Sequence, residues 1–237
     1  VNSGLFDFNG QNEGFDALNG SGGTILNNAA NTTSTMTVGS ENNGGTYSGT
    51  IADGNGVMAL TKTGTGTLTL NGTSTYTGPT TVSQGTLKLG AAGSIDNSAT
   101  LDIRSGATLD LTAKTAGFTI TDGQTLTGAG ILQIPSAATV SVEGVLAPGN
   151  PVSTLTVAGA GTLDISSAAD LAFELGASSD RILLSNGVLD IGTGVLDLDD
   201  FTFSFGTGFG LGAYTLVETS QPILGSLGPN LSGLVGG

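Results

Sequence analysis

Residues 57–90, VMALTKTGTGTLTLNGTSTYTGPTTVSQGTLKLG, form the most regular part of the sequence and indicate the fold. It contains three short runs in which apolar and polar residues alternate, at 67–70, 80–82 and 86–89. Alternation with a period of two is typical of a β-strand that buries one face. Glycine turns such as Gln84-Gly85 separate the runs, because glycine readily adopts a positive φ. The stretch therefore predicts three strands joined by tight turns.

Less regular copies of this unit follow along the chain, for example TLDI at 100–103 and TLDL at 108–111. Runs this short do not suit a sandwich or barrel, in which strands have about five or six residues. They suit a solenoid whose coils stack on one another. We predict an all-β protein, a right-handed parallel β-helix of about ten to twelve coils, from a coil length of about 20 residues. Leucine, valine and isoleucine would form inner ladders, and threonine would form outer ones.

The strongest break in the pattern is APGNP at residues 147–151, which contains two prolines. We place a boundary there. Residues 1–150 are predicted to be β-helix with an N-terminal docking or cap segment. Residues 151–237 are predicted to continue the β-helix or to form a C-terminal closing module with a tail. In this second part we expect strands at 195–198 and 214–217, the latter being the last before the tail.

Composition excludes several classes of function. The chain has no cysteine and no histidine, which rules out zinc sites with these ligands, thiol nucleophiles and catalytic triads built on imidazole. The formal net charge is −14, with 5 basic against 19 acidic residues. Nucleic-acid binding needs a basic surface, so we predict no nucleic-acid partner. No apolar run approaches the length of about 18 residues of a transmembrane segment.

Three segments of the central stretch carry a family resemblance: LTKTGTGTLTL at 60–70, TYTGPTTV at 75–82 and GTLKLG at 85–90. Together they closely resemble the autotransporter-associated β-strand repeat, also called the passenger-associated transport repeat. Residues 98–150 resemble the weaker coils that follow it, and residues 179–198 resemble a closing segment. The resemblance implies a right-handed parallel β-helix that is exported and displayed or shed outside a Gram-negative-type bacterial cell. The family shares no catalytic residues, so none are assigned.

The densest acidic cluster consists of Asp197, Asp199 and Asp200. Carboxylate oxygens are the ligands that calcium prefers, so these residues are the calcium candidates. The cluster lacks the glycine-rich nonapeptide of calcium-binding β-rolls, and a solvated acidic face is the alternative. We predict no cofactor, with calcium at these three residues as the alternative.

Asp102, Asp110 and Asp164 are candidates for sugar chemistry if they stack on adjacent coils. A glycosidase needs two carboxyl groups about 5–10 Å apart in a cleft, one of them with a raised pKa. However, the chain has only five cations and no tryptophan to stack on sugar rings. We therefore predict that the protein is not an enzyme. A polysaccharide-active β-helix enzyme is the lower alternative.

Five other side chains receive structural predictions. Lys62 and Lys88 are expected to point outward as gatekeepers that discourage aggregation, and Tyr76 is expected to pack at a coil corner. Asp180 and Arg181 are expected to form a local ion pair at a turn.

Aromatic and apolar residues gather near both ends of the chain. As candidates for a subunit interface we name Leu5, Phe6, Phe8, Phe15, Phe201, Phe203, Phe205 and Phe209. For the phenylalanines at 201–209, the alternative is that they form a wider core in the end coil. The ends of a β-helix expose strand edges that pair with similar edges, and no capping helix is predicted.

These features favour a non-enzymatic structural protein, secreted or on the bacterial cell surface. We predict that its subunits assemble head to tail into a filament or matrix fibre, since this type of contact propagates. The alternative is a monomeric autotransporter-type passenger or adhesin segment that binds glycans or other cells.

Overall fold

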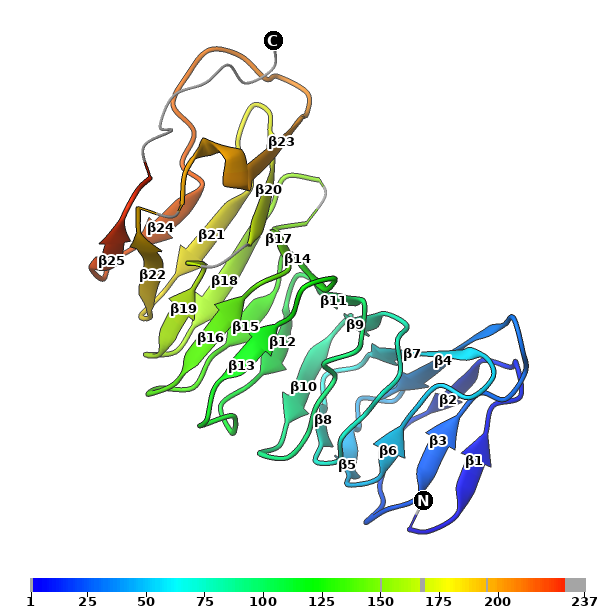
Figure 1. Ribbon diagram of the computed structural model, residues 1–237. Helices are drawn as coiled ribbons and strands as arrows, with labels where there is room; N and C mark the ends of the chain where they lie inside the picture. Colours follow the sequence, from blue (N-terminus) through cyan, green and yellow to red (C-terminus); the bar gives the residue numbers. More distant parts are fainter. Residues whose placement is uncertain (1, 150, 167–168, 195, 229–237) are drawn as a thin grey trace. The chain divides into compact units, whose positions relative to one another are not determined.

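The computed structural model describes residues 2–149, 151–166, 169–194 and 196–228. The chain divides into two compact units, residues 1–114 and 115–237. Both units consist of short strands that lie side by side in stacked layers (Figure 1). The strand pairs within each unit are parallel, for example β8 with β10 and β18 with β21. The predicted all-β parallel solenoid is therefore confirmed.

The first unit contains three sheets. Their strand orders are β1-β3-β6, β5-β8-β10-β12 and β2-β4-β7-β9-β11. The strands of this unit are β1 (Leu5–Asp7), β2 (Glu13–Phe15), β3 (Thr24–Leu26), β4 (Thr33–Val38), β5 (Gly45–Tyr47), β6 (Thr50–Ile51), β7 (Val57–Lys62), β8 (Thr67–Leu70), β9 (Thr80–Val82), β10 (Gly85–Leu89), β11 (Thr100–Ile103) and β12 (Ala107–Asp110).

The second unit repeats this plan. Its strand orders are β15-β18-β21-β24, β14-β17-β20-β23 and β13-β16-β19-β22-β25. Its elements are β13 (Phe118–Ile120), β14 (Thr125–Gly128), β15 (Ile131–Gln133), β16 (Thr139–Val142), β17 (Val145–Ala147), β18 (Thr154–Ala158), β19 (Thr162–Asp164), β20 (Asp170–Leu175), β21 (Arg181–Leu184), β22 (Val188–Thr193), the 3-10 helix η1 (Leu198–Asp200), β23 (Phe201–Phe205), β24 (Val217–Thr219) and β25 (Ile223–Ser226).

Inside each unit, equivalent residues of successive turns pair in register. Leu87 of β10 pairs with Leu68 of β8 on one side and with Leu109 of β12 on the other. All three leucines are buried. Burial of a leucine side chain contributes about 1.5–3 kcal/mol to stability, so these ladders form the core.

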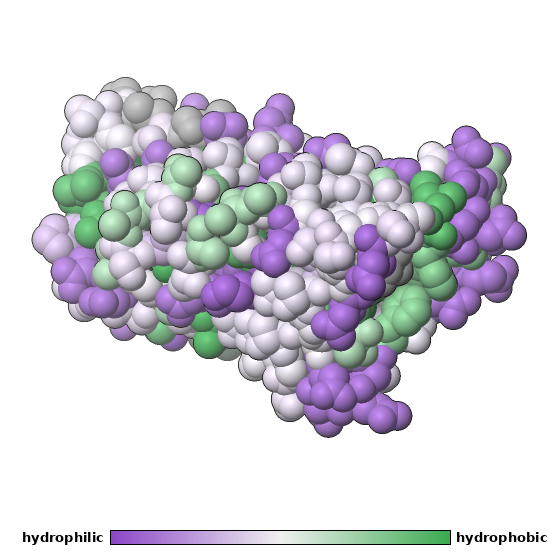
Figure 2. Space-filling view, turned by 90° about the horizontal axis from the view of Figure 1, so that it is seen from below, coloured by the Kyte–Doolittle hydropathy of each residue, from purple (hydrophilic) through white to green (hydrophobic). Residues whose placement is uncertain are grey.

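Threonines form ladders on the outer faces of the same sheets. Thr61 of β7 pairs with Thr37 on β4 and with Thr81 on β9. Each of these threonines is half-buried beside its neighbours. On the face shown in Figure 2 most of the surface is white or purple, and hydrophobic side chains form only small separate patches. The predicted division into inner apolar and outer threonine ladders is correct.

The turns of the first unit pack so closely that some of their glycines accept no side chain. Gly85 has a φ of +67°, and a Cβ atom there would lie 2.4 Å from the carbonyl oxygen of Gly64. At Gly72 a Cβ atom would lie 2.0 Å from the carbonyl oxygen of Gly49. Glycine is therefore required at these turns by backbone conformation and by close stacking.

The predicted number of coils is too high, because the solenoid has about seven turns. The length of one turn varies widely. Thr67 and its partner Thr86 are 19 residues apart, whereas Ile182 and its partner Val217 are 35 residues apart. A coil of about 20 residues fits only the shortest turns, since longer loops leave the solenoid between later strands.

Four further differences from the predicted strands are found. β7 was not predicted within residues 57–90, and β25 lies in the predicted tail. The strand expected at 214–217 begins only at Val217. Of the strand expected at 195–198, Val195 lies outside the described residues, and Leu198 opens a 3-10 helix. The predicted boundary at residue 150 falls between β17 and β18 of the second unit. Residue 150 itself also lies outside the described residues.

Candidate functional site

An aromatic cluster lies at the start of the first unit, on the outermost strands of two sheets. Phe6, Phe8 and Phe15 pack edge to face, with ring centroids 5.5 to 6.3 Å apart. Phe6 pairs with buried Ile25, so it occupies the inner column of the solenoid. It is nevertheless 38% exposed, and neighbouring Leu5 is 60% exposed. The cluster therefore covers the core partly and leaves apolar surface uncovered.

A second aromatic cluster lies on β23, at the other end of the second unit. Phe201, Phe203 and Phe205 pair in register with Leu171, Phe173 and Leu175, which are all buried. The three phenylalanines therefore share the inner face, as the alternation predicts. Phe205 is 47% exposed, because no described strand covers β23 on its outer side.

Aromatic residues after β23 extend this cluster. Phe209 lies 4.5 Å from Phe205 and 6.0 Å from Tyr214 between ring centroids. Phe209 and Tyr214, together with Leu175, Phe203, Leu211 and Leu216, line an apolar hollow of about 280 Å³. Four further exposed aliphatic residues were not predicted: Leu211, Ile223, Leu224 and Leu227. The sequence feature that could have indicated Ile223 and Leu224 is that they form a short apolar pair in a glycine-rich segment.

The structure thus places the eight interface candidates in two groups, four in each unit. Phe8 is only 2% exposed and is a core residue. The other seven are partly or largely exposed at outermost strands or beside them. Their role at a subunit interface stays a prediction.

The acidic cluster at 197–200 is engaged by its own backbone. Asp197 caps the 3-10 helix η1, and its Oδ1 accepts a hydrogen bond of 3.3 Å from Asp199 N. Asp200 Oδ2 in turn accepts one of 2.8 Å from Asp197 N. Among the residues described, no group of three or more His, Cys, Asp or Glu side chains could hold a metal ion. The absence of a cofactor stays a prediction, with calcium at this cluster as its alternative.

The carboxylates considered for sugar chemistry do not stack. Asp102 on β11 pairs with Thr81, whereas Asp110 on β12 pairs with Lys88, and the two strands belong to different sheets. Asp164 belongs to the second unit, where it pairs with Asp190.

Asp110 and Asp164, like Asp190, bond to the backbone that follows them. The carboxylates of Asp110, Asp164 and Asp190 each accept a hydrogen bond of 2.8 to 2.9 Å from the backbone N–H two residues ahead. Such short-range bonds terminate a strand and begin a turn. Turn formation therefore explains the Leu-Asp motif at Asp110 and Asp164, whereas Asp190 lies inside β22, where the register shifts between Asp190 and Thr193.

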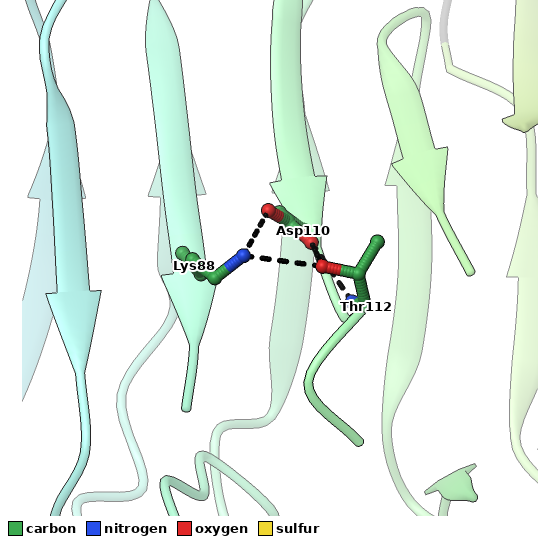
Figure 3. Close-up of polar contacts among 3 residues, drawn as sticks. All are labelled: Lys88, Asp110 and Thr112. Carbon is green, nitrogen blue, oxygen red and sulfur yellow. Dashed lines mark hydrogen bonds and ion pairs between the residues drawn. The ribbon is translucent and has the colours of Figure 1, made fainter. Parts of the chain in front are cut away.

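Lys88 and Asp110 form an outward-facing polar contact (Figure 3). Lys88 Nζ lies 2.8 Å from Asp110 Oδ2 and 3.1 Å from Thr112 Oγ1. Partial burial works against ionisation of Asp110, but the hydrogen bonds from Lys88 and Thr112 prevail and lower its pKa. The predicted outward position of Lys88 is confirmed.

The prediction that Lys62 points outward is wrong, because its side chain points into the core. It pairs with Val38 and Val82, both buried, and is itself fully buried. Its Nζ donates hydrogen bonds to the carbonyl oxygens of Thr63, Gly64 and Gln84. Burial lowers the pKa of Lys62. The lysine satisfies backbone carbonyls at the end of β7, so it is not an exposed gatekeeper.

The predicted ion pair of Asp180 with Arg181 is absent, since Arg181 Nη1 pairs instead with Glu218 Oε2 at 2.7 Å. Asp180 is buried and accepts 2.7 Å hydrogen bonds from the backbone N–H groups of Ser153 and Glu174. Burial raises its pKa, although these bonds work in the other direction. Its carboxylate therefore joins the loop before β18 to β20.

Tyr76 packs as predicted. Its side chain is buried, and its hydroxyl lies 2.5 Å from Thr80 Oγ1. Thr80 Oγ1 lies 2.9 Å from Ser98 Oγ, which completes a small buried polar network.

Comparison with known proteins identifies the central repeat. Residues 60–89 match the model of the passenger-associated-transport-repeat family, which confirms the resemblance found in the sequence. In the structure this segment extends from β7 through β10. A search of the curated proteins and a search of the solved structures each found no match to the chain. Within the described ranges, no helix has the length and apolar character needed to cross a bilayer.

Proposed function

We propose that this chain is a non-enzymatic structural segment of an exported bacterial surface protein, and that its copies join end to end. The repeat at 60–89 and the β-solenoid fold fit an autotransporter-associated, passenger-like protein. Export and display outside the cell follow from what this family resemblance implies. Self-assembly is supported by the exposed last turn of the second unit.

The outermost turn of the second unit is formed by β23, β24 and β25. Each is the last described strand of its sheet, so one side of its backbone has no described partner strand. Phe205, Ile223 and Leu224 expose about half of their surface there. Unpaired backbone groups beside apolar side chains form a surface that accepts an added strand.

The first unit of a second copy supplies a matching surface. β1 and β2 are the outermost described strands of their sheets, and their inner columns contain Phe6 and Phe15. Parallel addition of these strands would continue the ladders that already join successive turns. Such a contact is heterologous and does not close on itself, so it propagates as a filament.

The carboxylates favour a structural role over an enzymatic one. Asp110 and Asp164 are used at strand ends, Asp190 bonds to the backbone within β22, and Asp102 lies on a different sheet from Asp110. The absence of histidine and cysteine from the sequence removes the commonest nucleophiles and bases of hydrolases.

A concentration series tests the assembly. Mass measured by light scattering is expected to rise with concentration above the 23.2 kDa of one chain, and negative-stain electron microscopy is expected to show fibres. Ile223→Lys places a charge on the outermost strand and is expected to leave monomers. Thr61→Lys, on the outer face of β7, is the matched control and is expected to assemble normally. Monodisperse single chains at all concentrations would refute the proposal.

A further inference from the structure

A polar hollow on the second unit lies where three segments of the chain meet: the start of β18, the loop before β21 and the loop before β24. Its volume is about 440 Å³, within the range of about 300–1,000 Å³ typical of small-molecule sites. Five hydroxyl side chains line it: Ser153, Thr154, Ser178, Ser179 and Thr215. Arg181 and Tyr214 lie among them.

Two side chains of this hollow have unused hydrogen-bonding capacity. Ser153 Oγ and Arg181 Nε are shielded from solvent and have no hydrogen-bond partner within the described part of the chain. The backbone around them is fixed, because Ser153 N donates to Asp180 at 2.7 Å and Arg181 N donates to Ser153 O at 2.9 Å. Both atoms are inaccessible to a molecule the size of water, so a ligand in the hollow would bind the other polar groups of the lining.

The charge of the hollow favours a neutral ligand. Arg181 is the only basic residue of the sequence after Lys114. Its charge is balanced by Glu218, whose Oε2 lies 2.7 Å from Arg181 Nη1. The chain carries a net charge of −14, which repels anions. The guanidinium group still presents several N–H donors, and these suit hydroxyl oxygens.

Tyr214 contributes a flat apolar surface in a fixed position. Its ring stacks on Phe209 at 6.0 Å and an interplanar angle of 15°. Its hydroxyl accepts from Gly210 N at 3.1 Å and donates to Gly210 O at 2.9 Å. A tyrosine ring held in this way offers contact area at a low cost in conformational entropy, and it suits the C–H face of a pyranose ring.

We infer that this hollow binds a neutral saccharide. The ring of Tyr214 packs against the sugar, and Arg181 and the serine and threonine hydroxyls bind its hydroxyl groups. The inference is independent of end-to-end assembly, because it rests on the side-chain chemistry of one hollow within the second unit.

Calorimetry and ligand-observed NMR on the full chain test the inference. The neutral probes are methyl α-mannopyranoside, methyl β-galactopyranoside and maltotriose. Glucuronate and acetate are the anionic probes for comparison. At least one neutral probe is expected to bind. Arg181→Gln and Tyr214→Ala are expected to weaken its affinity at least about tenfold, the loss that follows from removing one good contact.

Two further variants separate recognition from folding. Arg104→Gln is the matched control, because Arg104 forms a similar exposed ion pair of 3.1 Å with Asp102 in the first unit, and it is expected to leave affinity unchanged. Thr215→Val removes an exposed hydroxyl of the lining, so it is expected to weaken saccharide binding while preserving thermal stability. Three results would overturn the inference. The first is that no neutral probe binds up to about 10 mM, which is a weak-affinity limit. The others are binding of the anionic probes alone and full affinity in Arg181→Gln.

Discussion

Replacing Lys62 with methionine tests how the hydrogen bonds of a buried lysine stabilise the first unit. The Lys62 ammonium group donates to the carbonyl oxygens of Thr63, of Gly64 at 2.8 Å and of Gln84 at 3.4 Å. Gln84 lies one turn further along the solenoid, after β9. A single side chain thus connects two successive turns.

The expected loss of stability follows from these contacts. Methionine fills nearly the same volume as the lysine stem, so the cavity contribution is small. It leaves the Gly64 carbonyl, the acceptor of the buried bond, without its donor. A buried acceptor that loses its partner costs about 1–3 kcal/mol, whereas the Thr63 and Gln84 carbonyls are partly accessible to water. We expect Lys62→Met to lower the free energy of unfolding by about 2 kcal/mol.

Urea denaturation followed by circular dichroism measures this change. Lys88→Met is the matched control, because Lys88 forms an outward ion pair with Asp110, and exposed pairs contribute only about 0–1 kcal/mol. The reasoning is refuted if Lys62→Met is as stable as the parent, or if both variants lose the same free energy.

The pH dependence of the same pair gives an independent check. Burial lowers the pKa of Lys62 below 10.5, so between the folded and unfolded pKa values the unfolded chain binds more protons. Stability then rises with pH in this window. The difference in stability between the parent chain and Lys62→Met is expected to grow as pH rises toward 10.5. A difference that shrinks would show that the ammonium form is favoured by folding.

Three other predictions concern stability. Gly85→Ala is expected to lower the free energy of unfolding by about 1–3 kcal/mol, because Gly85 has a positive φ and a carbonyl oxygen would lie 2.4 Å from the new Cβ atom. Gly106 also has a positive φ, but no described atom lies within 4 Å of the position of its Cβ. Gly106→Ala is therefore expected to cost less in the same urea assay. Tyr76→Phe removes the hydroxyl bonded to Thr80 and is expected to lower the free energy of unfolding by about 1 kcal/mol, whereas an unchanged urea midpoint would count against the buried network. Because the pKa of Asp110 lies below 3.8 in the folded state, its stabilisation is present above this value and is lost as pH falls through the folded pKa. Acid titration of Asp110→Asn is expected to show a smaller fall in stability than the parent chain, and identical acid curves would contradict this.

Alternation along residues 57–90 was sufficient to predict three strands and the solenoid. The period of two is a local property, and it assigns each residue of a run to the inner or outer face without knowledge of distant contacts. The observed strands β8, β9 and β10 coincide with the predicted runs to within one residue. The same rule places Lys62 on the inner face with Leu60, although a charge was expected outside. The sequence contained this signal, and the general preference of lysine for solvent overrode it.

The all-β parallel solenoid, the inner and outer ladders and the repeat at 60–89 can be predicted from the amino-acid sequence, because they depend on short-range periodicity and on glycine at tight turns. The number of turns becomes known only from the three-dimensional structure, since loop length varies between strands that pair. Only the tertiary structure separated Asp102 from Asp110 and joined Arg181 to Glu218. Which sheet a strand enters and which loops meet depend on how each turn closes in three dimensions, and spacing along the chain does not contain that information.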